Sequence, residues 1–315
     1  MLISKARSTN PISSIFLVFI FWSLNLFLSF REVFFDFSIW TDFILIKLIT
    51  AHLSILGISV LLNRTLQKNK LVGIGDALSG ILFLVFILGL NDVHKYYKEF
   101  VGLFLITLGN SQLMGLYNSQ KNYLKEFEIG ILFGLSVVIY PNLFLLLSII
   151  FIGISLLVPF SWRDFIVPLL GCLWTLFVKH ALFFILGIGD FDINFEFYFS
   201  VPKLKIDFDL DYILFFLLAL FELFLFLRIF TILEKRSIKD RAFYWLWLWT
   251  FIFLLLSLLF FQKSLDKFFF IAFLGLPCSV FSVEYFLKKG NLRGYWKKEF
   301  LIYLIIIIQF SLRIY

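Results

Sequence analysis

Apolar runs of membrane length recur along almost the whole chain, and they constrain its fold more than any other feature. From Ile12 onward, stretches of roughly 20 hydrophobic residues alternate with short charged loops. A run of this length crosses the ~30 Å hydrocarbon core of a bilayer as a helix. Lipid offers no hydrogen-bond partner to a free backbone N–H or C=O, so the spanning segments must be helical. Of the 315 residues, 61% are hydrophobic, which leaves almost no room for a soluble domain.

These runs predict an all-α fold, a polytopic transmembrane helical bundle of about 11 segments. No internal repeat and no low-complexity linker divides the chain, so residues 1–315 are expected to form a single integral membrane domain. The predicted spans are 12–30, 43–63, 74–90, 100–117, 129–140, 142–160, 165–189, 211–233, 242–261, 268–287 and 300–315.

The segment 129–140 is unusual, because its twelve residues rise only ~18 Å as a helix. Pro141 follows at once, and a proline disfavours helical geometry in the residue before it. The sequence therefore predicts a short helix, a sharp turn at Tyr140–Asn142 and a returning helix. One kinked helix through Pro141 is the alternative.

The basic residues indicate how the chain is oriented. With the N-terminus in the cytoplasm, 17 Lys and Arg residues fall on the cytoplasmic side and 8 on the other side. This bias agrees with the positive-inside rule and predicts a multi-pass membrane protein with a cytoplasmic N-terminus. The net charge of +7 therefore reports topology, and no nucleic-acid partner is expected.

The largest outer loop, 190–211, alternates apolar and polar residues with period two. Apolar residues face one way from Phe191 to Phe199, and the pattern resumes after Pro202. Such alternation around a proline turn predicts a small periplasmic β-hairpin at 191–210. Its Phe-rich face would lie on the membrane surface or on a partner, and an extended interfacial loop is the alternative.

Two ionisable residues lie deep in predicted spans that are neighbours in sequence. Lys179 is ten residues from the outer end of its span and Glu222 is eleven from the outer end of the next, so both lie about 15 Å deep. Ionisable groups at this depth are costly. The matching depth predicts a buried Lys179–Glu222 pair, which either holds the helices together or forms a substrate or proton site.

Few motifs point to chemistry. The three histidines and two cysteines are scattered, so no resident metal site and no certain cofactor is expected. The best catalytic candidate is the first outer loop, Arg31 to Asp42, which carries Glu32 and Asp36 close behind the first span. Carboxylates at the membrane surface act as a general base or bind a divalent cation. A solvated acidic loop is the alternative.

The stretch from Glu128 to Leu176 reads GILFGLSVVIYPNLFLLL and then SWRDFIVPLLG. It resembles the part of the glycosyltransferase-C superfamily in which a short helix, a Pro-containing turn, a long helix and a cytoplasmic Trp-Arg pair follow one another. The resemblance implies many transmembrane helices and a catalytic acid in the first outer loop, where Glu32 and Asp36 lie. The whole chain also resembles uncharacterised polytopic inner-membrane proteins of Bacteroidota, which share its length, its Phe/Ile/Leu-rich helices and its start from Arg7 to Ile12.

Three functions are compatible with these observations. The first is a glycosyltransferase-like enzyme that uses a polyprenyl-phosphate sugar at the outer leaflet, with Glu32 or Asp36 as the base. The second is a non-catalytic membrane subunit that holds an envelope complex together, and the third is a transporter or flippase. Membrane lipids are expected partners in all three. In the enzyme, the lipid phosphate would be held by the basic outer residues Arg31, Lys95, Lys98, Lys203 and Lys205.

Overall fold

The structure, a computed structural model, is helical throughout the part that it describes. That part contains 11 α-helices, two short 3-10 helices and no strand, which confirms the all-α class. The described residues are 11–35, 42–73, 75–117, 123–159, 161–186, 210–234, 236–261, 267–287 and 292–314. The elements are α2 (Pro11–Phe35), α3 (Asp42–Lys68), α4 (Leu78–Ile87), η2 (Val93–Tyr96), α5 (Tyr97–Met114), α6 (Tyr123–Ile139), η3 (Pro141–Leu147), α7 (Ser148–Leu157), α8 (Trp162–Leu186), α9 (Leu210–Leu233), α10 (Ile238–Phe261), α11 (Lys267–Leu287) and α12 (Leu292–Ile314).

The observed helix boundaries differ most from the predicted ones where charged residues border an apolar run. α6 begins at Tyr123, six residues before the predicted start, and its 17 residues rise about 26 Å. The predicted length of twelve residues was therefore too short, although α6 is still not among the described helices that are long and apolar enough to cross a membrane. Lys and Glu are good helix formers, so the charges at 125–128 end the apolar run without ending the helix. α12 likewise begins at Leu292 and not at residue 300.

The predicted chain reversal at Pro141 is confirmed. The backbone of Tyr140 is extended, with φ −135° and ψ 94°, and η3 begins at Pro141. This geometry follows from the steric restriction that a proline places on the preceding residue.

The packing on α5 shows the direction of the returning helix. A Cβ on Gly102, early in α5, would meet both Ser136 near the end of α6 and Leu143 in η3. Later in α5, Leu113 lies beside Gly153 of α7. α5 therefore runs antiparallel to α6 but parallel to η3 and α7, so the chain turns back at Pro141 and does not continue as one kinked helix.

Tertiary contacts divide the chain into two compact units. Unit 1 comprises Met1–Tyr97, Lys203–Tyr244 and Leu265–Tyr315, and unit 2 comprises Lys98–Pro202 and Trp245–Ser264. The single integral membrane domain expected from the sequence stays a prediction.

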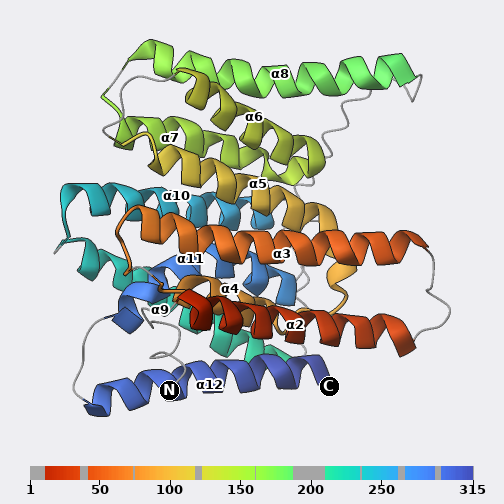
Figure 1. Ribbon diagram of the computed structural model, residues 1–315, viewed down its shortest axis with the longest axis vertical. Helices are drawn as coiled ribbons and strands as arrows, with labels where there is room; N and C mark the ends of the chain where they lie inside the picture. Colours follow the sequence, from red (N-terminus) through yellow and green to blue (C-terminus); the bar gives the residue numbers. More distant parts are fainter. Residues whose placement is uncertain are drawn as a thin grey trace. The chain divides into compact units, whose positions relative to one another are not determined.

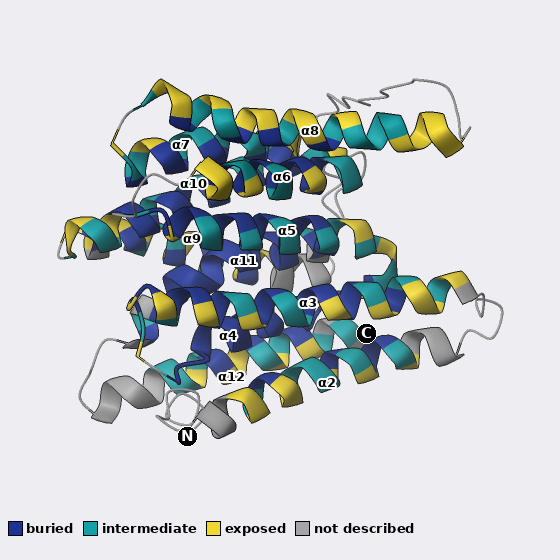
Figure 2. Ribbon diagram, turned by 45° about the horizontal axis from the view of Figure 1, so that its top comes forward, coloured by how far each residue is buried: buried dark blue, intermediate teal, exposed yellow. Residues whose placement is uncertain are grey.

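Unit 1 is built around α4. All ten residues of this helix are buried, and α2, α3 and α11 pack against it (Figures 1 and 2). Two close approaches fix the packing. Gly80 of α4 leaves no space for a Cβ beside Asn63 of α3, and Gly275 of α11 lies directly against the Phe86 side chain.

In unit 2, α6 and α8 pack as a close parallel pair. Gly130 faces the backbone of Pro168, and Gly134, one turn further along, faces Cys172 and Thr175. The small residues at 130 and 134 form a Gly-x-x-x-Gly pattern, which lets two membrane helices approach closely. The Sγ of Cys172 donates to the carbonyl oxygen of Gly130 at 3.2 Å, which is a further sign of this close approach.

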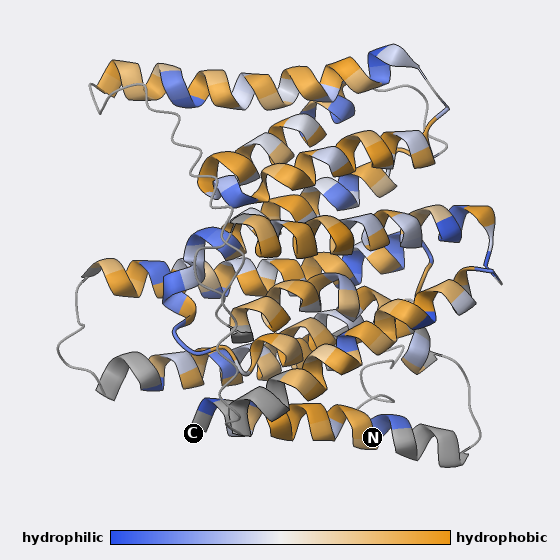
Figure 3. Ribbon diagram, turned by 180° about the vertical axis from the view of Figure 1, so that it is seen from behind, coloured by the Kyte–Doolittle hydropathy of each residue, from blue (hydrophilic) through white to orange (hydrophobic). Residues whose placement is uncertain are grey.

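In the part of the chain that the structure describes, three helices are long and apolar enough to cross a membrane, namely Phe43–Lys68, Trp162–Leu186 and Ile238–Phe260. Shorter apolar helices are Ile15–Arg31, Leu78–Ile87, Pro141–Leu157 and Phe269–Val283. Figure 3 shows how apolar residues dominate these elements. The lengths and compositions support association with a membrane.

Candidate functional site

A partly buried polar network in unit 1 is centred on Arg313, in the last turn of α12. Its guanidinium donates to the hydroxyl of Ser29 at 2.7 Å, to the carbonyl oxygen of Leu88 at 3.1 Å and to Oδ1 of Asn25 at 3.4 Å. One cation thus connects α12, α2 and the residue that follows α4. Bonds from a charged donor are stronger than those between neutral groups.

The helical period of α2 builds one side of this network. Asn25 and Ser29 are four residues apart, so they share a face of the helix, and they are 0% and 1% exposed. Asn25 also donates to the carbonyl oxygen of Leu84 in α4 at 3.2 Å. The predicted base Glu32 follows Ser29 by three positions in the same helix.

Two further polar side chains border the network with unused hydrogen-bonding capacity. His52 of α3 is 1% exposed and close enough to Arg313 for electrostatic interaction, yet neither ring nitrogen has a hydrogen-bond partner among the described residues. Gln309 lies one turn before Arg313 and is 1% exposed, and its Nε2 also lacks such a partner there. Buried polar atoms are usually hydrogen-bonded, so these atoms suit a polar ligand group.

The first of the loops predicted to be outer begins later than the sequence predicted. Arg31 and Glu32 lie in the last turns of α2, because the helix continues to Phe35. Arg31 is exposed. Asp36 lies outside the described residues, so its place relative to Glu32, and a divalent cation held between the two carboxylates, stay predictions.

Two of the other predicted phosphate ligands, Lys95 and Lys98, lie in the described part of the chain, three residues apart. Lys95 is exposed and forms an ion pair with Asp92 in the η2 turn, and Lys98 is exposed at the start of α5. Lys203 and Lys205 lie outside the described residues. The predicted β-hairpin at 191–210 lies there too, except for Leu210, which begins α9.

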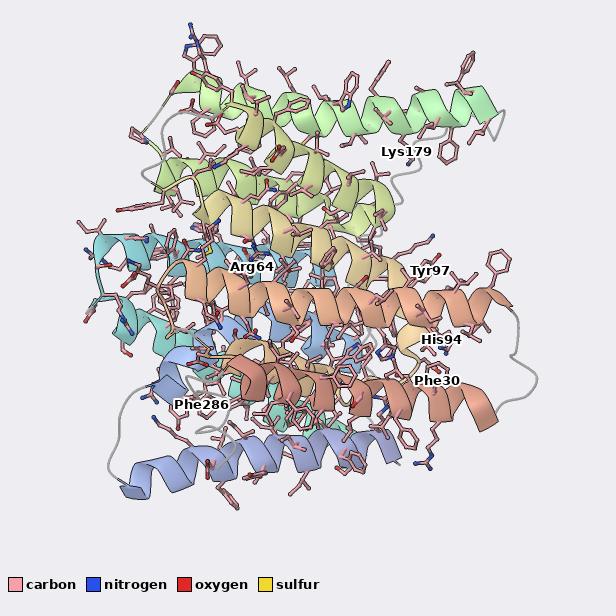
Figure 4. All side chains as sticks on the ribbon, in the orientation of Figure 1. Phe30, Arg64, His94, Tyr97, Lys179 and Phe286 are labelled. Carbon is pink, nitrogen blue, oxygen red and sulfur yellow. The ribbon has the colours of Figure 1, made fainter. Side chains whose placement is uncertain are left out.

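Lys179 and Glu222 belong to different compact units. Lys179 projects from the later part of α8 (Figure 4), and its Nζ lies 6.0 Å from the ring centroid of Phe183. Glu222 lies in α9 and is 2% exposed. The Lys179–Glu222 pair stays a prediction.

Sequence reasoning missed a second polar cluster, which lies in unit 2. Glu99 lies near the start of α5, close enough to Tyr140 for electrostatic interaction, and Asn142 Nδ2 donates to the Tyr140 hydroxyl at 3.0 Å. The hydroxyl of Ser257 in α10 donates to the carbonyl oxygen of Asn142. The Pro141 turn was a sequence signal for part of this cluster, but its contact with α5 depends on tertiary packing.

The stability of unit 2 is expected to fall as the pH rises, because of Glu99. This residue precedes the predicted span 100–117, and burial raises its pKa from 4.5 to about 7, partly offset by a backbone hydrogen bond and by Lys98. The folded state therefore binds more protons than the unfolded state between these values. The contribution of Glu99 to the free energy of unfolding is therefore full below pH 4.5, declines as the pH rises toward 7, and is lost above it.

The replacement Glu99→Gln is expected to flatten this pH dependence. It removes a pH-dependent change of order 2 kcal/mol in the free energy of unfolding. Denaturant unfolding in detergent at an acidic and at a mildly alkaline pH measures it. The control Glu128→Gln, which alters an exposed acid of α6, is expected to keep the wild-type slope. Equal slopes in wild type and Glu99→Gln would show that Glu99 is not the responsible group.

No cluster of three or more His, Cys, Asp or Glu side chains suited to a metal occurs in the part of the chain that the structure describes. The two cysteines are free, and they lie on α8 and α11. The polar network around Arg313 is therefore the best-formed candidate site in that part, and it suits an anionic or hydrogen-bonding group.

Comparison with curated proteins and with solved structures finds no match. Comparison with protein families matches residues 8–315, nearly the whole chain, to one described as a family of unknown function, DUF6427. The chain therefore belongs to the DUF6427 family.

Proposed function

We propose that this protein is a multi-pass protein of a bacterial inner membrane, with a cytoplasmic N-terminus, that acts as a glycosyltransferase-C-like enzyme on a polyprenyl-phosphate sugar. The observation that carries the proposal is the Arg313 network. Its guanidinium contacts Ser29 of α2, three positions before Glu32 in the sequence and near the end of α2 predicted to be the outer one.

The proposed glycosyl transfer needs one cation and one base near the outer end of α2. Arg313 would bind the lipid phosphate, since a guanidinium matches phosphate oxygens. Glu32, or Asp36, would take the proton from an acceptor hydroxyl. The acceptor oxygen then bonds to the anomeric carbon of the sugar, and the bond from that carbon to the phosphate oxygen breaks. The polyprenyl phosphate leaves with the electron pair, stabilised by Arg313.

The remaining predicted ligands would help to hold the phosphate headgroup. They are Arg31, Lys95, Lys98, Lys203 and Lys205, of which the first three are exposed in the structure. Exposed basic residues near a membrane surface attract anionic lipid headgroups, so they would gather the substrate before it reaches Arg313.

Native mass spectrometry of the protein, extracted gently from its own membranes, tests the proposal. A bound polyprenyl phosphate is expected, and its occupancy is expected to fall at least about tenfold in Arg313→Gln, as loss of one charged contact implies. Glu32→Ala with Asp36→Ala should retain the lipid but lose sugar transfer. A protein that carries only bulk phospholipid would overturn the proposal.

A non-catalytic envelope subunit is the second candidate, favoured by the apolar surface of α8. Only 11% of its membrane-length window is buried, and Trp174 and Phe177 on it are 52% and 63% exposed. The same mass spectrum distinguishes the two candidates, since a subunit would retain a stoichiometric protein partner.

A further inference from the structure

Glu222 is a buried acid that the proposed enzyme does not use. It lies in the middle of α9 in unit 1, and only 2% of its surface is exposed. Its Oε1 has no hydrogen-bond partner anywhere among the described residues. Buried polar atoms are normally paired, and a group left unpaired at such depth is a functional candidate.

The surroundings of Glu222 are almost wholly apolar. α11 packs along α9, and its Cys278, which is 0% exposed, lies close enough for electrostatic interaction with Glu222. The neighbouring position Phe221 stacks on Phe86 of α4, with ring centroids 6.4 Å apart. Two residues further along α9, Phe224 meets the edge of Tyr285 at 6.0 Å. The residues on either side of Glu222 in α9 therefore contact α4 and α11 through aromatic rings.

Charged groups on the elements packed around α9 lie away from Glu222 along the chain. On α9 itself, Arg228 is six residues further, about 9 Å along the axis, and its guanidinium lies 4.4 Å from the Tyr285 ring centroid. α4 has no titratable residue. α11 has Lys267 at its start and Glu284 six positions beyond Cys278. On α12 the charged residues lie at 293–299 and at Arg313, with Tyr303 between them.

An ionised carboxylate in such surroundings has a large desolvation cost, and a proton removes that cost by neutralising the group. We propose that Glu222 is a proton-binding site in the interior of unit 1. The ligand is the proton itself, held on a carboxyl between α9 and α11. Such intramembrane acids serve proton relays. This inference does not rest on the proposed glycosyl transfer.

Dicyclohexylcarbodiimide tests the proposal, because this apolar reagent reacts with a protonated carboxyl. The carboxyl oxygen bonds to the central carbon of the reagent while the proton moves to its nitrogen, and acyl migration then gives a stable N-acylurea without a leaving group. The full-length protein in its native membrane is treated at neutral pH, purified and digested. Mass spectrometry is expected to locate one adduct on Glu222.

Two variants sharpen the experiment. Glu222→Gln is expected to lose the adduct, whereas Glu234→Gln, which alters an exposed acid just after α9, is expected to retain it. An unmodified Glu222 in the wild-type protein would overturn the proposal, and this result does not depend on how any variant folds. An adduct that appears only in Lys179→Met would also overturn it, and would support the Lys179–Glu222 ion pair instead.

Discussion

Gly130→Leu is expected to abolish the close pairing of α6 and α8 and to prevent unit 2 from folding. A side chain at position 130 would overlap the backbone of Pro168, and backbone cannot move aside as a flexible side chain can. Overpacking a tight interface costs about 1–3 kcal/mol, and a backbone clash belongs at or above the top of this range. Thermal unfolding of the purified protein in detergent measures the loss.

Matched variants separate this effect from the general cost of replacing a glycine. Gly134→Leu is expected to behave like Gly130→Leu, because it would overlap Thr175 on the same face of α8. Gly73→Leu is the control, since a Cβ there meets nothing within 4 Å. If Gly130→Leu unfolds at the same temperature as Gly73→Leu, the close approach of α6 and α8 does not hold unit 2 together.

Arg313→Gln is expected to destabilise unit 1 by about 2–3 kcal/mol and to remove the polyprenyl phosphate that we propose binds there. The shorter, neutral side chain cannot replace the guanidinium bonds to Ser29 and Leu88, and it leaves the buried Asn25 with fewer partners. Arg313→Lys keeps the charge but loses the forked geometry, so it is expected to recover stability only in part. Unfolding curves and lipid occupancy are measured on the same samples.

The control for Arg313 is Arg64→Gln, because Arg64 belongs to the same unit and is exposed on α3 (Figure 4). It is expected to unfold like the wild type, since isolated surface charges contribute little. An Arg313→Gln protein with normal stability but no bound lipid would assign the residue to binding alone. Normal stability together with full lipid occupancy would refute both roles.

Sequence reasoning succeeded where the evidence is local. The apolar runs predicted the all-α class, and Pro141 predicted the extended conformation of Tyr140, because a proline restrains its immediate neighbour. Local charge was misleading at the N-terminus of α6, where Lys and Glu continue the helix beyond the apolar run. The Gly-x-x-x-Gly pattern at 130–134 was a usable signal for close helix packing, and it went unused.

The candidate site shows where sequence reasoning stopped. Asn25 and Ser29 lie inside a predicted span, four residues apart, which marks a polar helix face. Arg313 entered the sequence argument only as one of the basic residues on the outer side. Nothing in the local sequence indicates that these residues meet, because they are separated by 284 to 288 positions.

The sequence by itself determined that this chain forms apolar helices and where it turns, because backbone hydrogen bonding in an apolar solvent and proline sterics act over a few residues. Only the tertiary structure decided which helices meet and which polar groups become buried together. Helix pairing depends on the fit between distant surfaces, such as the glycine face of α6 against Pro168 and the Ser29 face of α2 against Arg313. No pattern within one segment contains that information.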